Sequence, residues 1–252
     1  MAESKAWQAR KAAAGYSCIT WPKEWGGPGG ANWQSQVFSQ EESKYDVANG
    51  GPFAIGLGMC IPTLMAYGSE EAKKRFVWPA VQGDEIWCQL FSEPAGGSDV
   101  ANLRTRAEKN GDTWTINGSK IWTTGAQFSD YGIILTRTDP NVPKHKGLTM
   151  FYIDMKDPGV DIRPIKQASG GSGFNEIFFT DVKVKDSQRL GEVGQGWTVA
   201  LTTLMHERLA VGGGQGGGLD VPQLMQLARS LELEDGPAIK NAAVREKIAD
   251  WY

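Results

Sequence analysis

The alternation of apolar and polar residues divides the chain into three stretches. In the first, up to about residue 87, residues that favour helices cluster between glycine-rich turns. The clusters predict helices over residues 3–14, 34–45 and 70–81. Ser69 before Glu70 and Glu71 is typical of a helix start, because a serine hydroxyl caps backbone amides and acids favour that end of the dipole. We expect a partial helical domain over 1–87.

The second stretch, 88–191, carries short runs of β-branched and aromatic residues separated by turn residues. Asn117-Gly118 lies between the runs 114–116 and 119–124, and an Asn-Gly pair in that setting predicts a tight hairpin turn. Further runs predict strands over residues 132–136, 148–153, 160–163 and 176–179. Many short strands between turns indicate an antiparallel barrel or sandwich, and we expect a central antiparallel β-barrel.

The third stretch, 192–252, returns to a helical pattern after Gly196. At about 100° per residue, four apolar residues share one arc of this helix: Trp197, Leu201, Leu204 and Leu209. Arg208 falls within that arc, Glu207 falls beside it, and His206 falls opposite. Segments 224–233 and 242–252 are also helical, and the last one stops without a capping glycine or asparagine. The sequence therefore predicts an α+β protein with a truncated C-terminal helical domain.

Composition limits the classes of function. The 26 basic and 29 acidic residues give a net charge of −3, and no dense basic run is present, so we expect no nucleic-acid binding. Three cysteines form no CxxC pair and only two histidines occur, which argues against a metal site and fits a reducing, cytoplasmic setting. Residues 49–67 carry no charge, but their glycines and prolines favour a buried helix interrupted by loops over a membrane span.

Two short segments carry candidate chemistry. Gly96 and Gly97 before Ser98 allow backbone amides to converge on a phosphate, although a plain surface turn explains the same residues. Farther on, Trp122 precedes two threonines at the end of a strand. A planar cofactor ring could stack on the indole and accept hydrogen bonds from the hydroxyls, although a strand tryptophan is more often core.

These segments stand in an order that resembles the acyl-CoA dehydrogenase family. The shared motifs are separated along the chain: Ser92-Glu93-Pro94, Gly97-Ser98-Asp99, Asn117-Gly118, Lys120, Trp122, Thr124, Leu190–Trp197 and Glu207-Arg208. The likeness runs from about Gly15 to Tyr252 and is closest to bacterial members that read Ile19–Glu24 near the front. Full members begin with further helices and carry a longer C-terminal helical bundle, so this chain looks like a fragment.

The resemblance implies an FAD cofactor held by eight residues. Three would line the flavin, two would lie beside the pyrophosphate, and three would pack on the isoalloxazine ring: Gln89, Phe91 and Ser92; Gly97 and Ser98; Trp122, Thr123 and Thr124. The reaction implied is removal of the α-proton of an acyl-CoA thioester with β-hydride transfer to flavin N5, giving a trans-2-enoyl-CoA.

Glu207 is the expected catalytic base, because one branch of the family carries its glutamate directly before this arginine. Another branch places the base in a later segment that this chain lacks. The resemblance also implies substrate contacts from four residues: Ser98, Met205, His206 and Arg208. The expected partners are an electron-transfer flavoprotein or similar acceptor and, in the full-length protein, further copies in a homodimer or homotetramer.

Two other functions stay open at this point. A non-catalytic scaffold subunit could keep the fold without a working site, and an acyl-CoA oxidase could share every motif. The glycine run 212–217 satisfies the GxGxxG string, but it follows a helix rather than a strand, so we expect a flexible break instead of a dinucleotide site.

Overall fold

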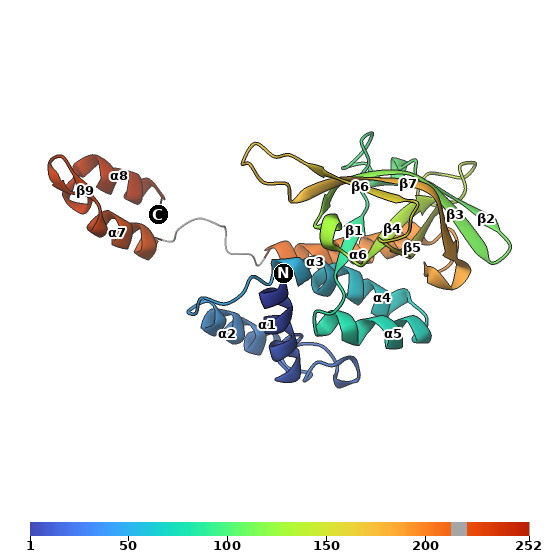
Figure 1. The fold of residues 1–252 in the computed structure, drawn as a ribbon, viewed down its shortest axis with the longest axis horizontal. Coiled ribbons are helices and arrows are strands. Elements are labelled where there is room, and N and C mark those ends of the chain that lie inside the picture. Colours follow the sequence, from blue (N-terminus) through green and yellow to red (C-terminus); the bar gives the residue numbers. More distant parts are fainter. Residues whose placement is uncertain (213–220, 252) are drawn as a thin grey trace. The chain divides into compact units, whose positions relative to one another are not determined.

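The computed structural model describes residues 1–212 and 221–251 of the chain, which forms two compact units, 1–212 and 213–252 (Figure 1). Six α-helices belong to the first unit: α1 (Ala2–Ala13), α2 (Asn32–Glu42), α3 (Gly51–Ile55), α4 (Ile61–Tyr67), α5 (Glu70–Val81) and α6 (Gly196–Gly212). The three helices predicted for the N-terminal stretch are confirmed as α1, α2 and α5. Ser69 caps α5 as expected, because its Oγ accepts from Ala72 N at 3.2 Å.

Residues 51–67 form one uninterrupted helical run, in which a π-helical segment, Gly56–Cys60, joins α3 to α4. The prediction of a helix in this segment is therefore confirmed, but the predicted interruption by loops is wrong. Gly56 allows the run to approach β1, since a Cβ there would lie 3.3 Å from Trp87 Cβ. Within the described ranges, no helix is long and apolar enough to cross a membrane.

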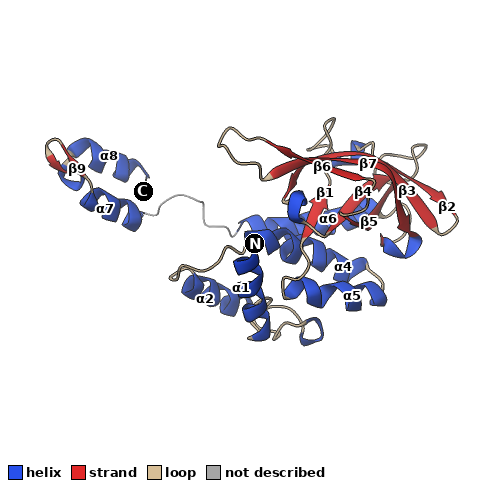
Figure 2. Ribbon diagram, viewed as in Figure 1, coloured by secondary structure: helices blue, strands red, loops and turns tan. Residues whose placement is uncertain are grey.

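Eight strands form one sheet in the first unit (Figure 2): β1 (Trp87–Leu90), β2 (Arg106–Asn110), β3 (Thr113–Thr124), β4 (Tyr131–Arg137), β5 (Leu148–Asp154), β6 (Val160–Ile165), β7 (Phe174–Lys185) and β8 (Arg189–Leu190). Their order is β6-β7-β3-β2-β4-β5-β8, and β1 pairs with β4. The α+β class is confirmed. Among the described strands no pairing closes this path, so barrel closure is not confirmed.

The sheet is not wholly antiparallel, which corrects the prediction at two places. β1 runs parallel to β4 over four residue pairs, and Arg106 at the start of β2 pairs in parallel with Arg137. More than 40 residues separate the paired positions of β1 and β4, as with Trp87 and Tyr131. A parallel pairing needs such a long connection, and short turns alone do not reveal it.

Asn117 and Gly118 lie inside β3, so the predicted hairpin turn is wrong. The chain reverses instead at Gly111, between β2 and β3. The Asn117 amide exchanges two hydrogen bonds with Asp181 of β7, at 3.1 and 2.9 Å. Gly118 has a φ of +148° where the β3–β7 register shifts, and a Cβ there would lie 2.6 Å from Thr105 Cα. The Asn-Gly pair therefore accommodates a bulge in a long strand.

The sheet separates two apolar cores. One core lies between the sheet and the helices, and it contains Trp87 and Phe91 together with residues of α4, α5 and α6. The other lies on the opposite face of the sheet and contains Cys88 and Leu90. Because side chains alternate along a strand, Gln89 projects to the helical side with Trp87 and Phe91.

Helix α6 packs through small side chains and through part of the predicted apolar arc, since Trp197 and Leu204 are partly buried against the core. Three of its short side chains are buried: Val199 and Ala200, which are adjacent, and Thr203 one turn later. Thr203 Oγ1 lies 2.9 Å from Thr63 Oγ1 of α4, a contact that only short side chains permit. Leu201 of the predicted arc is 45% exposed, so that prediction is wrong for it, and the Leu209 side chain lies outside the described residues.

The second unit contains α7 (Val221–Ser230), the two-stranded pair β9 (Glu232–Leu233) and β10 (Gly236–Pro237), and α8 (Ala242–Trp251). The predicted helix 224–233 corresponds to α7, which ends earlier because β9 follows at once. The predicted helix 242–252 corresponds to α8, although Tyr252 lies outside the described residues. The predicted flexible break at 212–217 also lies outside them, except for Gly212.

Candidate functional site

The end of β1 and the middle of β3 lie side by side, which brings several predicted flavin-facing residues together. Ile121 N donates to Ser92 O at 2.9 Å. Gly97 lies next to Ser92, since a Cβ at that glycine would be 3.9 Å from Ser92 Oγ. Phe91 is buried and Ser92 is half-buried, so the segment presents one polar side chain beside an apolar anchor.

Trp122 follows this contact and stands out in both exposure and backbone. Its side chain is 57% exposed, and its φ is +60°, a left-handed value that is rare outside glycine. The β3–β7 register shifts between Lys120 and Thr123, and the Trp122 ring meets Phe174 edge-on at 6.2 Å. Such a backbone costs about 1–3 kcal/mol and clusters at binding and catalytic sites. The tryptophan therefore forms an exposed aromatic platform.

The two threonines after Trp122 differ from each other. Thr123 is buried, and its Oγ1 has no hydrogen-bond partner within the described part of the chain. Thr124 is exposed. Asn175 Nδ2 donates to Thr123 O at 3.0 Å and holds the strand end in place. A buried hydroxyl without a partner is a donor that a polar ring edge can use, so Trp122 and Thr123 fit an isoalloxazine ring in chemistry.

The turn 93–96 is closed by its own backbone. Glu93 N and Gly96 O, and Gly96 N and Glu93 O, each lie 3.0 Å apart. Gly97 and Ser98 follow it at the surface. Among the described residues, the Ser98 hydroxyl makes no hydrogen bond to another predicted site residue.

Glu207 lies on α6 and meets β1. Gln89 Nε2 donates to Glu207 Oε2 at 3.4 Å, and both side chains are half-buried. The contact places the predicted base against the strand that leads directly to Phe91 and Ser92. Met205 and Arg208 are exposed and His206 is half-buried. Within the described part of the chain, these three predicted substrate residues make no hydrogen bond to the predicted flavin-facing residues.

The sequence motifs did not reveal a buried ion pair that lies next to the candidate site. Lys120 Nζ lies 2.9 Å from Glu93 Oε1, and neither side chain is more than 5% exposed. Burial lowers the pKa of Lys120 to about 8. Burial also opposes ionisation of Glu93, but Lys120 and two backbone amides outweigh it and lower the pKa of that carboxyl. Alternation along β3 could have revealed the burial of Lys120 from the sequence, because it places Lys120 on the same face as the buried Trp114 and Ile116.

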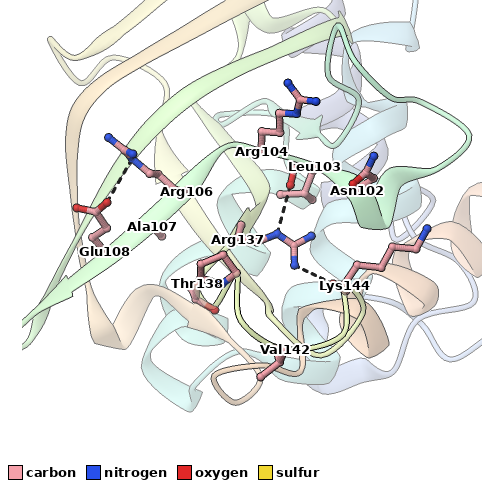
Figure 3. A pocket seen from close by; sticks show the side chains of 11 residues that line it. Asn102, Leu103, Arg104, Arg106, Ala107, Glu108, Arg137, Thr138, Val142 and Lys144 are labelled. Carbon is pink, nitrogen blue, oxygen red and sulfur yellow. Dashed lines mark hydrogen bonds and ion pairs between the residues drawn. The ribbon is translucent and has the colours of Figure 1, made fainter.

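A separate cavity of about 540 Å³ lies where β2 and β4 meet the loop after β4 (Figure 3). Four cationic side chains line it: Arg104, Arg106, Arg137 and Lys144. Arg137 donates to three backbone carbonyls, those of Ala101, Leu103 and Lys144. Lys144 pairs with Asp99, and Arg106 pairs with Glu108. Most of these cations therefore brace the protein itself, and no predicted site residue lines the cavity.

Comparison with known families now identifies the class. Models of the acyl-CoA dehydrogenase N-terminal, middle and C-terminal domains match residues 2–84, 88–182 and 194–252. The chain belongs to the acyl-CoA dehydrogenase family. Members of this family are FAD-dependent flavoproteins, in agreement with the fit found at Trp122 and Thr123.

Named relatives agree with this assignment. The acyl-CoA dehydrogenase IpdE1 of Mycobacterium tuberculosis is 38% identical over 249 residues, which cover 96% of this chain and 63% of that protein. Human mitochondrial short-chain specific acyl-CoA dehydrogenase is 30% identical over 75% of this chain and 46% of its own. The solved Tcur3481-Tcur3483 steroid ACAD is 31% identical, with a TM-score of 0.81 over 98% of this chain and 62% of that one. The chain thus spans less than two thirds of these relatives.

Proposed function

We propose that the whole protein dehydrogenates an acyl-CoA thioester between its α and β carbons and yields a trans-2-enoyl-CoA. The observation that carries this proposal is the contact between Glu207 and Gln89 at 3.4 Å. It sets a carboxylate beside the strand that ends in Phe91 and Ser92, where the family likeness seats the flavin. The proposed division into domains is 1–87, 88–191 and 192–252.

The proposed FAD seat uses the residues that the motifs single out. Trp122 offers the exposed ring face and Thr123 the buried free hydroxyl, while Phe91 and Ser92 flank them. Gly97 and Ser98 are exposed directly after the turn beside this group, where backbone amides suit a pyrophosphate. Bound FAD supplies the hydride acceptor that an α,β-dehydrogenation requires.

Glu207 is the proposed base that takes the α-proton. Gln89 donates to Oε2 and thereby orients the carboxylate, which leaves Oε1 to accept the proton. Met205 and Arg208 are exposed on the same helix and, with His206 and Ser98, are the proposed contacts to the thioester ligand.

Replacing Glu207 with Gln tests this role. Glu207→Gln should lower exchange of the substrate α-proton with D2O at least about 100-fold, since general-base catalysis contributes 10²–10⁴-fold. The amide keeps the size of the side chain, so FAD affinity should stay within about two-fold. Mass spectrometry of a recovered acyl-CoA measures the exchange, and the flavin spectrum measures the cofactor.

Glu41→Gln on α2 is the matched control, because Glu41 is an exposed residue that pairs with the exposed Lys44. Full exchange in Glu207→Gln would place the base elsewhere. A wild-type chain that takes up FAD but shows no bleaching with any acyl-CoA would favour a non-catalytic scaffold. Bleaching followed by rapid recovery in air would favour an acyl-CoA oxidase.

The acceptor and assembly are also proposals. We propose an electron-transfer flavoprotein or a similar acceptor, and a homodimer or homotetramer of the full-length protein. The names of similar structures include a steroid ACAD and the ChsE4-ChsE5 complex of Mycobacterium tuberculosis. A substrate panel should therefore include steroid-derived CoA thioesters as well as straight-chain ones.

A further inference from the structure

The buried pair of Lys120 and Glu93 adjoins the proposed flavin site without being part of the proton transfer. Lys120 is fully buried, and its Nζ donates to Glu93 Oε1 at 2.9 Å and to Phe91 O at 3.0 Å. Taking two charges out of water is costly, and apolar residues of similar size often stabilise a core equally well. A contribution to stability is therefore a weaker explanation for this ion pair than the arrangement of the backbone that it holds in place.

The pair connects three separate segments of the chain. Glu93 Oε2 accepts from Arg104 N at 2.6 Å, and Oε1 accepts from Thr105 N at 2.9 Å. These two residues precede β2, whereas Lys120 belongs to β3 and Phe91 follows β1. One carboxylate and one ammonium thus hold three segments in a single arrangement, and they contact the backbone of Phe91, Arg104 and Thr105.

The same segments present the proposed flavin contacts. Ser92 lies between Phe91 and Glu93, and its carbonyl accepts from Ile121 N, directly after Lys120. Trp122 comes next, with a φ of +60°. A left-handed tryptophan persists only where its surroundings hold it. Lys120, through its side chain, and Ile121, through its amide, are both anchored directly before this conformation.

We propose that Lys120 and Glu93 are positioning residues for the flavin site, which hold Phe91-Ser92 against Ile121-Trp122 without touching the cofactor. This inference rests on the proposed function, because it takes Trp122 and Ser92 to face the flavin. Its direct consequence is a backbone arrangement that exists before the cofactor binds. The arrangement is therefore measurable without FAD.

The charge state of Lys120 makes the ion pair with Glu93 depend on pH. Burial lowers the pKa of Lys120 to about 8, and Glu93 is the charged group that faces it among the described residues. On β7 the register partner of Lys120 is Ile177, which carries no charge. The charge of Arg137 on β4 interacts with that of Glu93 rather than with that of Lys120. Above pH 8 Lys120 loses its proton in the folded state, so its ion pair with Glu93 is lost and FAD affinity should fall.

The test compares the 252-residue chain with the double variant Lys120→Met, Glu93→Gln. This change removes both charges at nearly constant volume, so it avoids a buried unpaired carboxylate that could unfold the protein. Hydrogen exchange without FAD should become at least ten-fold faster at the Ile121 amide and stay unchanged at Ile133 in β4. The FAD dissociation constant of the double variant should be at least ten-fold higher than that of the wild type. The wild-type constant should increase above pH 8, whereas that of the double variant should not.

Lys183→Met is the matched control, because Lys183 is exposed on β7 and donates to Thr115 Oγ1 at 2.7 Å. Unchanged exchange at Ile121 in the double variant would overturn the proposal, and so would an equal increase at Ile133, which indicates general destabilisation. If the wild-type chain takes up no FAD while Ile121 loses protection in the double variant, the proposed function fails and the positioning of the backbone stands.

Discussion

At the scale of single residues, the site combines a strained tryptophan with an unpaired threonine hydroxyl. Trp122 holds a left-handed backbone and exposes more than half of its surface, while Thr123 buries a hydroxyl that has no partner in the described residues. Neither feature stabilises the chain by itself. Both are expected where a ligand supplies the missing contacts.

Thr123→Val should therefore increase stability and weaken FAD binding. Valine has the shape of threonine without the hydroxyl, and an unpaired buried hydroxyl costs about 1–3 kcal/mol. The free energy of unfolding without FAD should rise by about 1 kcal/mol in urea denaturation.

Thr136→Val is the control for this change. Thr136 is equally buried, but its Oγ1 donates to Thr149 O at 3.0 Å, so its replacement leaves a buried carbonyl without that donor. It should lose about 1 kcal/mol of stability. A loss of similar size in Thr123→Val would show that its hydroxyl has a partner in the protein.

At the scale of elements, β3 carries the site because it is long and twice irregular. Its register on β7 shifts once at Asn117-Gly118 and again between Lys120 and Thr123. The first shift lets the strand pass close to Thr105, and the second exposes Trp122. Bulges of this kind redirect side chains without ending the strand.

Gly118→Ala should disrupt this element. Its Cβ would lie 2.6 Å from Thr105 Cα, and φ is +148°, so the variant should lose at least about 2 kcal/mol of stability. Gly111→Ala is the comparison, since its φ is +61° but no atom lies within 4 Å, and it should lose only about 1 kcal/mol. Equal losses in thermal or urea unfolding would show that close packing at Gly118 is not the cause.

At the scale of the whole molecule, one half-buried junction links several parts of the sheet and gives the first unit an acid dependence. Asp186 accepts from Arg189 Nη2 at 3.2 Å and from Trp114 Nε1 at 2.7 Å. These hydrogen bonds, from Arg189 first, lower the pKa of Asp186 to about 2 from an ordinary value of 3.8. A carboxylate with a lowered pKa adds stability above pH 4 that is lost as pH falls towards 2.

Asp186→Asn should flatten that acid loss. The wild type should lose at most about 2 kcal/mol more than the variant between pH 4 and pH 2, and the side chain's partial exposure reduces this figure. Urea unfolding at several pH values measures the difference. Asp161→Asn, which changes an exposed pair with Arg163, should follow the wild type. Parallel curves of unfolding free energy against pH for Asp186→Asn and the wild type would contradict this, because they would mean that the pKa of Asp186 is the same in the folded and unfolded states.

The helices α1, α2 and α5, the strands β4 to β7 and the family motifs could be predicted from the sequence, because each depends on nearby residues. Ser69 caps α5 within one turn, and alternation along β4 needs no knowledge of its partner. The grouping of Ser92 with Trp122 was also predictable, but only through the motif order. Geometry then supplied the contact between Ser92 O and Ile121 N.

Other features depend on partners that lie far away in the chain. Asn117-Gly118 is typical of a turn in sequence, but it pairs with Asp181 in the folded chain. Alternation can place Lys120 on the buried face, but it does not identify Glu93, 27 positions away, as its partner. The buried face of α6 and the contact of Glu207 with Gln89 likewise require the sheet and helices to be in place. Local patterns encode the periodicity of an element, whereas burial, register and charge pairing are properties of two surfaces that meet only after folding.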